Sequence, residues 1–345
     1  MADSLLDVRD LQTHFHTDAG VARAVDGISF DIKQGECVAL VGESGCGKSV
    51  TSLSIMRLLP SPPAQTTGTI TFAGKNILDL SEEQMCSTRG AQIAMIFQEP
   101  QSALNPVFTV GNQIAEAYTT HHPQTRAKEA WDRTIEAMRQ VGIPDPERRA
   151  LDYPHQLSGG MKQRICIAMA LICGPKLLIA DEPTTALDVT IQAQILVLLK
   201  KLQKEHNLSL LLITHDLGVV AEMAERTNVM YAGKIVEKCA TSDLFRRPLH
   251  PYTQGLLRAR PDAGSSRFGR RRLSVIPGIV PAATQFKDNC RFNPRCPLCT
   301  DICTQKEPAL DDLGGDHRAA CFHTKPEGID AWKEPAAATE TAAKK

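Results

Sequence analysis

A glycine-rich stretch has the residue types and spacing of a phosphate-binding loop. Residues 42–49 read GESGCGKS and fit the pattern G-x-x-x-x-G-K-[ST]. Its backbone N–H groups can turn toward phosphate oxygens, Lys48 would bridge the β- and γ-phosphates, and Ser49 would bind Mg²⁺. A chance glycine-rich turn is the alternative, but apolar stretches flank the loop as the motif requires. The residues expected to contact the nucleotide are Gly42, Glu43, Ser44, Gly45, Cys46, Gly47, Lys48, Ser49 and Val50.

Two adjacent carboxylates, Asp181 and Glu182, end the apolar stretch LLIAD at 177–181. Neighbouring side chains of a strand point in different directions, so one carboxylate can hold Mg²⁺ while the other faces an attacking water. An acidic pair alone is also typical of a solvated turn. Together with the phosphate loop, the pair predicts a nucleoside triphosphatase.

A second phosphate-sized pocket is predicted by LSGGMKQR at 157–164, where Ser158, Gly159 and Gly160 precede an apolar helical pattern. Taken alone, this stretch would be an ordinary helix N-cap. One nucleotide should not need two such pockets, so the second pocket is expected to serve the nucleotide of a partner across a dimer.

The elements that hold these motifs have two kinds of apolar pattern. Residues 37–42, 177–181 and 208–214 are apolar on both faces, which is typical of buried parallel strands, and 190–206 has helical spacing. Residues 5–11, 24–32 and 68–74 indicate half-buried strands of an antiparallel sheet. A polar helical segment at 110–150 indicates a helical insertion into an α/β core.

Composition bounds the remaining possibilities. The chain has 345 residues, 42% hydrophobic residues and a formal net charge of zero, so no general attraction to nucleic acid is expected. No stretch of eighteen apolar residues is present, and the N-terminal residues do not form a secretory signal. We therefore expect a reducing cytosolic setting, in which eleven cysteines favour metal binding over disulfides.

The order of these motifs resembles the ATP-binding-cassette (ABC) family over residues 5–250. The resemblance implies a P-loop NTPase (RecA-like) α/β core with an antiparallel β subdomain and an α-helical subdomain. It also implies an aromatic residue that stacks on adenine (Phe15), a Q-loop glutamine (Gln98), a D-loop aspartate (Asp188) and a switch histidine (His215).

The same resemblance assigns roles to the site residues. Glu182, His215 and Gln98 would be catalytic, and Ser49, Gln98 and Asp181 would hold Mg²⁺. The signature that acts on a partner's nucleotide would consist of Leu157, Ser158, Gly159, Gly160 and Gln163.

Longer stretches, among them YPHQLSGGMKQR and RRPLHPYTQGLL, resemble the ATPase subunits of dipeptide and oligopeptide importers. The dipeptide type is nearer than the oligopeptide or nickel type. This resemblance implies a heterodimer with a second homologous ATPase subunit, two integral membrane permease subunits and a peptide-binding protein outside the membrane. The chain would lie on the cytoplasmic face of the membrane. Two weaker hypotheses are an ABC protein of DNA repair or ribosomes and a redox-sensing ATP-binding module.

Five cysteines near the C-terminus raise a separate question of metal binding. Four thiolates suit Zn²⁺ or an iron–sulfur cluster, and gaps of five, six and seventeen residues fit poorly with paired zinc ligands. The importer resemblance implies a [4Fe-4S] cluster on Cys290, Cys296, Cys303 and Cys321. Cys299 could be a bystander or exchange with a neighbour. His317 and His323 are expected to be surface residues, with zinc ligation as the alternative for both. Free thiols and disulfides rank lower.

The expected domain organisation follows from these assignments. Residues 1–255 would form the nucleotide-binding domain, with the helical subdomain at about 99–160. Residues 256–325 would form a cysteine-rich extension, beginning with a basic linker that contains RFGRRR at 267–272. Residues 326–345 would be a disordered tail.

Overall fold

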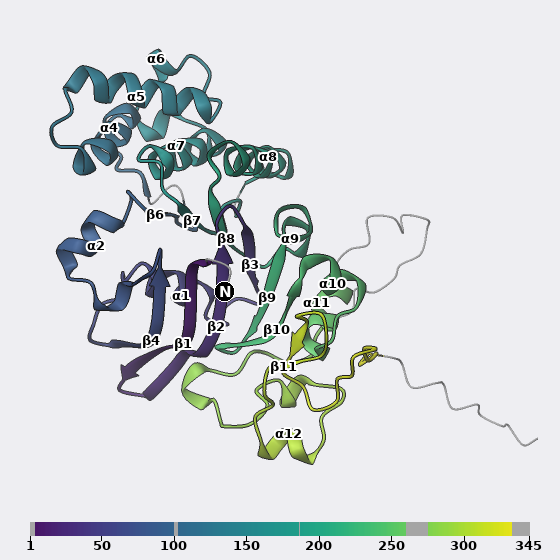
Figure 1. Ribbon diagram of the computed structural model, residues 1–345. Helices are drawn as coiled ribbons and strands as arrows, with labels where there is room; N and C mark the ends of the chain where they lie inside the picture. The colour runs from purple at the N-terminus through teal and green to yellow at the C-terminus, as the bar shows by residue number, and fades with distance from the viewer. Residues whose placement is uncertain (1–3, 100–102, 186, 260–274, 333–345) are drawn as a thin grey trace, which may run out of the picture.

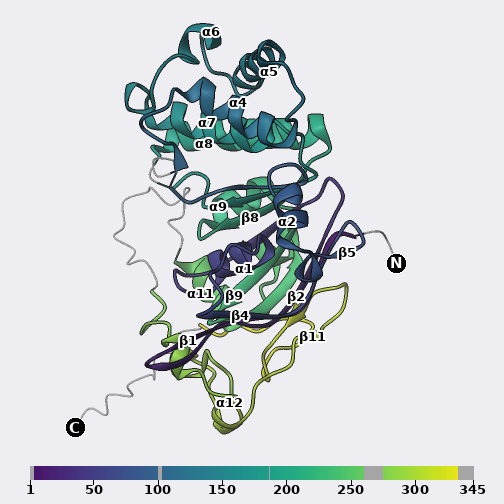
Figure 2. The same ribbon diagram turned by 90° about the vertical axis from the view of Figure 1, so that its left-hand side faces the viewer.

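Two β-sheets and a helical lobe make up the computed structural model, which describes residues 4–99, 103–185, 187–259 and 275–332. Figure 1 shows the helical lobe at one end, the C-terminal extension at the other, and the sheets between them; Figure 2 gives the perpendicular view. The basic run at 267–272 and residues 333–345 lie outside the described residues. No helix among the described residues is long and apolar enough to cross a membrane.

The larger sheet holds the predicted α/β core. Five of its strands run parallel, and β3, β7 and β8 are buried along their whole length, as the apolar patterns predicted. The order across the sheet is β11 (Asp311–Asp312), β12 (Arg318–Ala319), β10 (Lys234–Ala240), β9 (Arg226–Tyr231), β3 (Cys37–Val41), β8 (Ser209–Thr214), β7 (Leu177–Asp181) and β6 (Ile93–Ile96).

The smaller sheet is antiparallel and contains the three predicted half-buried strands. Its inner face joins the strand before the phosphate loop in one apolar cluster, in which Leu6, Phe30 and Ile70 pack with Val38 and Leu40. The sheet therefore supports the loop from one side. Its strands, in spatial order, are β2 (Gly20–Lys33), β1 (Ser4–Thr17), β4 (Ala64–Phe72) and β5 (Lys75–Asn76).

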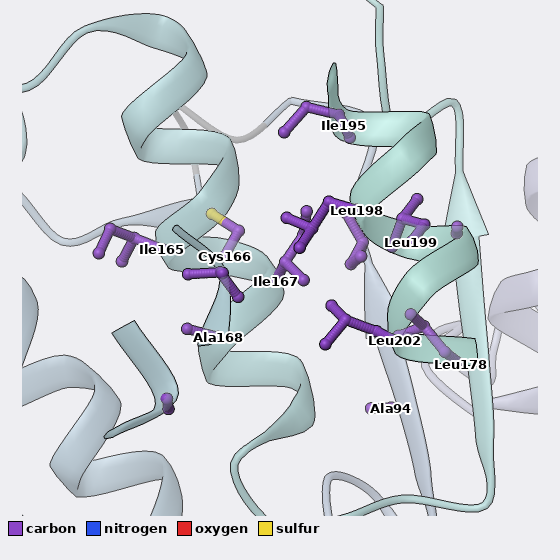
Figure 3. Packing of buried hydrophobic residues seen from close by; sticks show 14 of the residues in the cluster. Ala94, Ile165, Cys166, Ile167, Ala168, Leu178, Ile195, Leu198, Leu199 and Leu202 are labelled. Atoms are coloured by element: carbon purple, nitrogen blue, oxygen red, sulfur yellow. The ribbon is translucent and has the colours of Figure 1, made fainter. Parts of the chain in front are cut away.

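A helical lobe occupies the predicted insertion. It contains α4 (Val110–His121), α5 (Ala127–Gln140) and α6 (Pro146–Arg149), and it packs against α7 (Gly159–Leu171). Figure 3 shows how α7 and α8 (Val189–His206) bury apolar side chains against each other, with Ile167 facing Leu198 and Leu202. This packing links the lobe to the core sheet.

The remaining helices are short. They are α1 (Lys48–Ile55), α2 (Glu82–Thr88), α9 (Leu217–Met223), α10 (Thr241–Arg246), α11 (Pro251–Arg258) and α12 (Asp301–Gln305), with 3₁₀ turns η1 (Ile77–Asp79), η2 (Pro154–Gln156), η3 (Ala283–Gln285) and η4 (Asn293–Arg295).

The C-terminal region differs from the prediction in two places. The boundary at 255 falls inside α11, whose helix continues to Arg258. The predicted tail begins at 326, but residues 329–332 contact α11: the Trp332 indole donates to the carbonyl of Pro251 at 2.8 Å and the Ala331 N–H donates to Gln254 at 2.9 Å. Strands β11 and β12 extend the core sheet, so the extension packs onto the core.

Candidate active site

The phosphate loop lies between β3 and α1, as its sequence predicted. Gly47 adopts a φ of 104° at the start of α1, and a Cβ there would lie 2.3 Å from the carbonyl oxygen of Ala24, so only glycine fits. The buried Lys48 ammonium donates to the carbonyl oxygens of Gly42 at 2.8 Å and Glu43 at 3.0 Å. The lysine is therefore held within the loop that it is expected to serve.

The loop residues differ in how far they face outward. Ser44 and Gly45 are exposed, and Glu43, Ser49 and Val50 are half-buried. The side chain of Cys46 is fully buried, and burial raises the pKa of its thiol. Cys46 can therefore meet a phosphate through its backbone but not through its sulfur.

Asp181 has the environment of a cation ligand. It is buried at the end of β7, burial raises the pKa of its carboxyl group, and a hydrogen bond with Ser49 opposes that shift. Ser52 donates to Oδ2 at 3.4 Å, whereas Oδ1 is buried with no hydrogen-bond partner. A buried carboxylate oxygen without a partner beside a serine hydroxyl fits Mg²⁺, which prefers oxygen ligands.

The predicted catalytic residues Gln98 and His215 both contact the third, Glu182. His215 Nδ1 lies 3.0 Å from Oε1, and the Gln98 amide donates to Oε2 at 3.0 Å. The Thr185 hydroxyl also donates to Oε2, at 2.9 Å. Gln98 thus contacts Glu182, and its expected role in holding Mg²⁺ with Ser49 and Asp181 stays a prediction. Thr185 lies in the sequence stretch TTALD, in which only Asp188 was predicted to have a role.

The backbone and charge of Glu182 are set by this cluster. Its φ of 47° is in the left-handed region, which is uncommon for a residue with a side chain. Burial opposes ionisation of Glu182, but hydrogen bonds from His215 and Thr185 outweigh it and lower its pKa. Glu182 is therefore an ionised acceptor at neutral pH.

This arrangement can carry out phosphoryl transfer to water. Glu182 can accept a hydrogen bond from the attacking water and orient it, and His215 can neutralise charge on the transferred phosphoryl group together with Lys48. Mg²⁺ bound by Ser49 and Asp181 would supply further neutralisation of the phosphate oxygens.

The signature and the D-loop lie next to each other. Ser158 caps α7 by accepting from the Met161 N–H at 3.4 Å, and Asp188 caps α8 by accepting from the Ile191 N–H at 2.9 Å. A Cβ on Gly160 would lie 2.7 Å from Ile191 Cγ2, so glycine allows this close approach. The N-terminal ends of α7 and α8, which carry the signature and the D-loop, are therefore in contact.

The signature residues face in two directions. Ser158 and Gly159 are exposed, whereas Leu157 and Gln163 are buried. Gln163 was expected to act on a partner's nucleotide, but its amide donates to the carbonyl of Pro183 at 2.6 Å. It therefore ties α7 to the loop after Glu182, and its buried side chain does not face outward.

Phe15 is half-buried on β1, where it lies opposite Ala22 of β2 and Ala64 of β4. The neighbouring Thr13 hydroxyl lies 2.7 Å from the Ser54 hydroxyl of α1, so this end of the small sheet is joined to the helix that follows the phosphate loop. The part-exposed ring is consistent with a stacking surface for a base.

The four expected cysteine ligands gather in the extension. The Cys290 N–H donates to the carbonyl of Cys303 at 3.1 Å. His323 Nε2 lies 3.5 Å from Cys303 Sγ, and the His323 N–H donates to Cys321 Sγ at 3.4 Å. Burial raises the pKa of Cys290 to about 11 and that of Cys296 to about 12, with a smaller contribution from the neighbouring thiols. Cys299 is exposed, unlike the other four.

A different trio has the closest spacing of potential metal ligands. Among the described residues, Glu237, Cys239 and His317 form the group of three ligand atoms within 4.8 Å of one another. Glu237 already accepts from the N–H groups of Leu249 at 2.7 Å and His250 at 2.9 Å and from His317 at 2.7 Å. These bonds satisfy the carboxylate. His317 was expected at the surface, but it is 1% exposed because its ring is buried against Glu237.

Comparison with family models gives two matches. Residues 25–185 match the model described as "ABC transporter", and residues 236–303 match "Oligopeptide/dipeptide transporter, C-terminal region". The first contains the phosphate loop, Gln98, the signature and Glu182. The second contains three of the four expected cysteine ligands.

Comparison with curated proteins gives relatives over almost the whole chain. A probable peptide ABC transporter ATP-binding protein of Sinorhizobium fredii, y4tR, is 54% identical over 325 residues, covering 94% of this chain and 96% of the relative. The dipeptide transport ATP-binding protein DppD of Escherichia coli is 49% identical over 320 residues, covering 93% and 97%.

Solved structures match the core. The dimeric ATP-binding cassette MJ0796, in a post-hydrolysis state bound to ADP and phosphate, has a TM-score of 0.61 and 27% identity, covering 68% of this chain and 98% of that chain. CbiO1 of Clostridium perfringens, part of an ABC transporter complex, has a TM-score of 0.60 and 30% identity, covering 71% and 91%. With the site geometry, these matches show that the chain is an ATPase that belongs to the ATP-binding subunits of ABC transporters of the peptide-transporter group.

Proposed function

We propose that this chain powers the import of dipeptides and other short peptides across the cytoplasmic membrane by hydrolysing ATP. The observation that carries the hydrolysis is the hydrogen-bonded cluster of Gln98, Glu182 and His215. The direction and cargo are supported by relatives that cover more than nine tenths of the chain and are named as dipeptide or peptide ATP-binding proteins. Oligopeptides and nickel are the alternative cargoes.

The working unit is a heterodimer with a second homologous ATPase subunit. Support comes from the surface formed by the signature and the D-loop, where Ser158 and Gly159 are exposed and Val189, at the start of α8, is 83% exposed. In that dimer Ser158, Gly159 and Gly160 act on the partner's nucleotide, and the partner's signature acts on the nucleotide held by Lys48.

Two integral membrane permease subunits dock beside the helical lobe. A cavity of about 340 Å³ lies between the end of β6 and α7, with a mostly apolar lining that includes Leu58, Phe97 and Met169. Phe97 and Leu58 are 45% and 41% exposed, so the cavity presents apolar surface to a partner. A short apolar helix of a permease could bind in this cavity. Because the cavity lies next to Gln98, changes at the γ-phosphate could move the bound helix.

The transport test uses the assembled complex in sealed vesicles, with ATP on the side of the ATPase subunits and a peptide-binding protein on the other. We expect ATP-dependent uptake of a labelled dipeptide, with slower uptake of a pentapeptide and of Ni²⁺. The matched control is the same complex carrying Glu182→Gln, which should not transport. Equal uptake of Ni²⁺ and dipeptide, or failure of the chain to assemble with any membrane subunit, would reject this cargo assignment.

We further propose that Cys290, Cys296, Cys303 and Cys321 hold a [4Fe-4S] cluster. Four thiolates suit an iron–sulfur cluster, and gaps of five, six and seventeen residues fit poorly with paired zinc ligands. Deprotonation on binding the metal would overcome the raised pKa of Cys290 and Cys296.

Anaerobic purification should yield about four iron and four sulfide ions per chain, measured by chemical analysis. Cys303→Ala should remove most of the iron, because Cys303 is a buried proposed ligand. Cys299→Ala is the matched control and should keep it, since Cys299 is exposed. Stoichiometric zinc without sulfide, or equal loss of iron in both variants, would refute the cluster.

A further inference from the structure

An arginine of the cysteine-rich extension reaches the phosphate loop. Arg295 ends η4, directly before Cys296, and its side chain is only 3% exposed. Its Nη1 donates to Glu43 Oε2 at 2.7 Å and its Nη2 donates to Oε1 at 3.0 Å. This is a two-point, charge-assisted contact between the extension and the second residue of the loop.

Glu43 is held in the loop at two further points. Its N–H donates to the Tyr252 hydroxyl at 2.9 Å, and its carbonyl oxygen accepts from Lys48 Nζ at 3.0 Å. Arg295 therefore binds the side chain of Glu43, and the backbone carbonyl of the same residue binds Lys48. A change at Arg295 can reach Lys48 through one intervening residue.

Arg295 is itself fixed by the extension. Its Nε donates to the carbonyl of Pro277 at 2.8 Å, and the ring of Phe292 packs edge-on against Tyr231 with centroids 5.2 Å apart. Phe292 also lies 5.5 Å from the ring of Tyr252, which contacts Glu43. The segment between Cys290 and Cys296 is thus anchored to the core on the side that faces the loop.

A second arginine of the same segment supports the opposite end of the loop. Arg291 donates to the carbonyl of Ala232 at 2.6 Å, and the next residue, Gly233, donates its N–H to the carbonyl of Cys46 at 2.9 Å. Arg291 is also paired with Asp26 of β2. The residues beside two proposed ligands, Cys290 and Cys296, therefore both connect to the phosphate loop.

We propose that Arg295 is a positioning residue for ATP binding, so that the affinity for nucleotide depends on the fold of the cysteine-rich extension. Arg295 neutralises Glu43, which otherwise places a negative charge in a loop that must receive a polyphosphate, and it holds the backbone that orients Lys48. This inference concerns the ATP site and holds whatever cargo the transporter carries.

A double-mutant cycle on the full chain tests the proposal, with the Kd of a fluorescent MgATP analogue as the readout. Arg295→Met should weaken binding roughly tenfold, the size of one charge-assisted hydrogen-bonded contact. In a Glu43→Gln background, Arg295→Met should change the Kd by less than about twofold, because the charge that Arg295 neutralises is gone. Arg295→Lys keeps the charge and should restore part of the affinity.

Arg318→Ala is the matched control, since Arg318 lies in the same extension, is 44% exposed and pairs with Asp312 and Asp316. It should leave the Kd unchanged. Melting temperatures are measured on all variants. A lower melting temperature with an unchanged Kd in Arg295→Met would make the arginine merely structural and overturn the proposal. An equal effect of Arg295→Met in both backgrounds would also overturn it, because Glu43 would not be the route.

Discussion

Replacing Glu182 with glutamine should lower the rate of ATP hydrolysis by about a hundredfold to ten-thousandfold while ATP still binds. The amide has the shape of the carboxylate but cannot accept a proton from water. It also places an N–H₂ group among the donors of Gln98, Thr185 and His215 that now bond the two carboxylate oxygens. Single-turnover hydrolysis of labelled ATP, with the Kd for MgATP measured separately, gives both quantities.

The control for this variant is Glu222→Gln, which makes the same change at an exposed position of α9 and should leave turnover unaffected. We also expect the Glu182 variant to accumulate as an ATP-bound dimer with its partner subunit, because closure precedes the blocked step. Turnover near the wild-type rate in Glu182→Gln would remove this residue from its assigned role. Loss of ATP binding would instead indicate that the loop itself had been disturbed.

The core of the fold could be predicted because its signals are local. The stretches CVALV and LLIAD are apolar on both faces, and such runs are stable only where a sheet is covered on both sides. The phosphate-loop motif is contained within eight residues, so it could be recognised without knowledge of distant contacts. The half-buried strands were recognised by alternation, although β1 and β2 run several residues beyond the predicted ends.

The contacts that complete the site are not local, and the sequence patterns did not reveal them. Arg295 and Glu43 are 252 positions apart, and no periodicity relates them. The same is true of Gln98 and Glu182, which are 84 positions apart and joined by a hydrogen bond. The contact of Trp332 with α11 was not predicted, because it joins residues 81 positions apart and the surrounding composition is that of a low-complexity tail.

Distant contacts also join the cysteine-rich extension to the nucleotide-binding core. The extension adds β12 to the core sheet by pairing with β10, and it inserts Phe292 between aromatic side chains of the core. Glu237 of β10 lies at this junction, where it accepts from the backbone before α11 and from His317, next to β12. Glu237 therefore joins β10, the segment before α11 and the extension through one buried carboxyl group.

Replacing Glu237 with alanine should cost about 3–5 kcal/mol of unfolding free energy, because the Leu249 and His250 N–H groups and His317 would lose their buried acceptor. At about 2–4 °C per kcal/mol, the melting temperature should fall by roughly 10 °C. Differential scanning fluorimetry of the full chain measures the change. The control is Glu205→Ala, an exposed residue 3.8 Å from Lys201, whose loss should change stability by less than about 0.5 kcal/mol.

Glu237→Gln separates the charge of this residue from its hydrogen bonds. The glutamine oxygen can still accept from Leu249 and His317, which both bond the same carboxylate oxygen, Oε1. Its NH₂ group would then meet the His250 N–H, donor against donor, where Oε2 now accepts at 2.9 Å. We therefore expect a melting temperature between those of the wild type and Glu237→Ala. A glutamine variant as stable as the wild type would contradict this account, because an uncharged side chain would then satisfy all three donors.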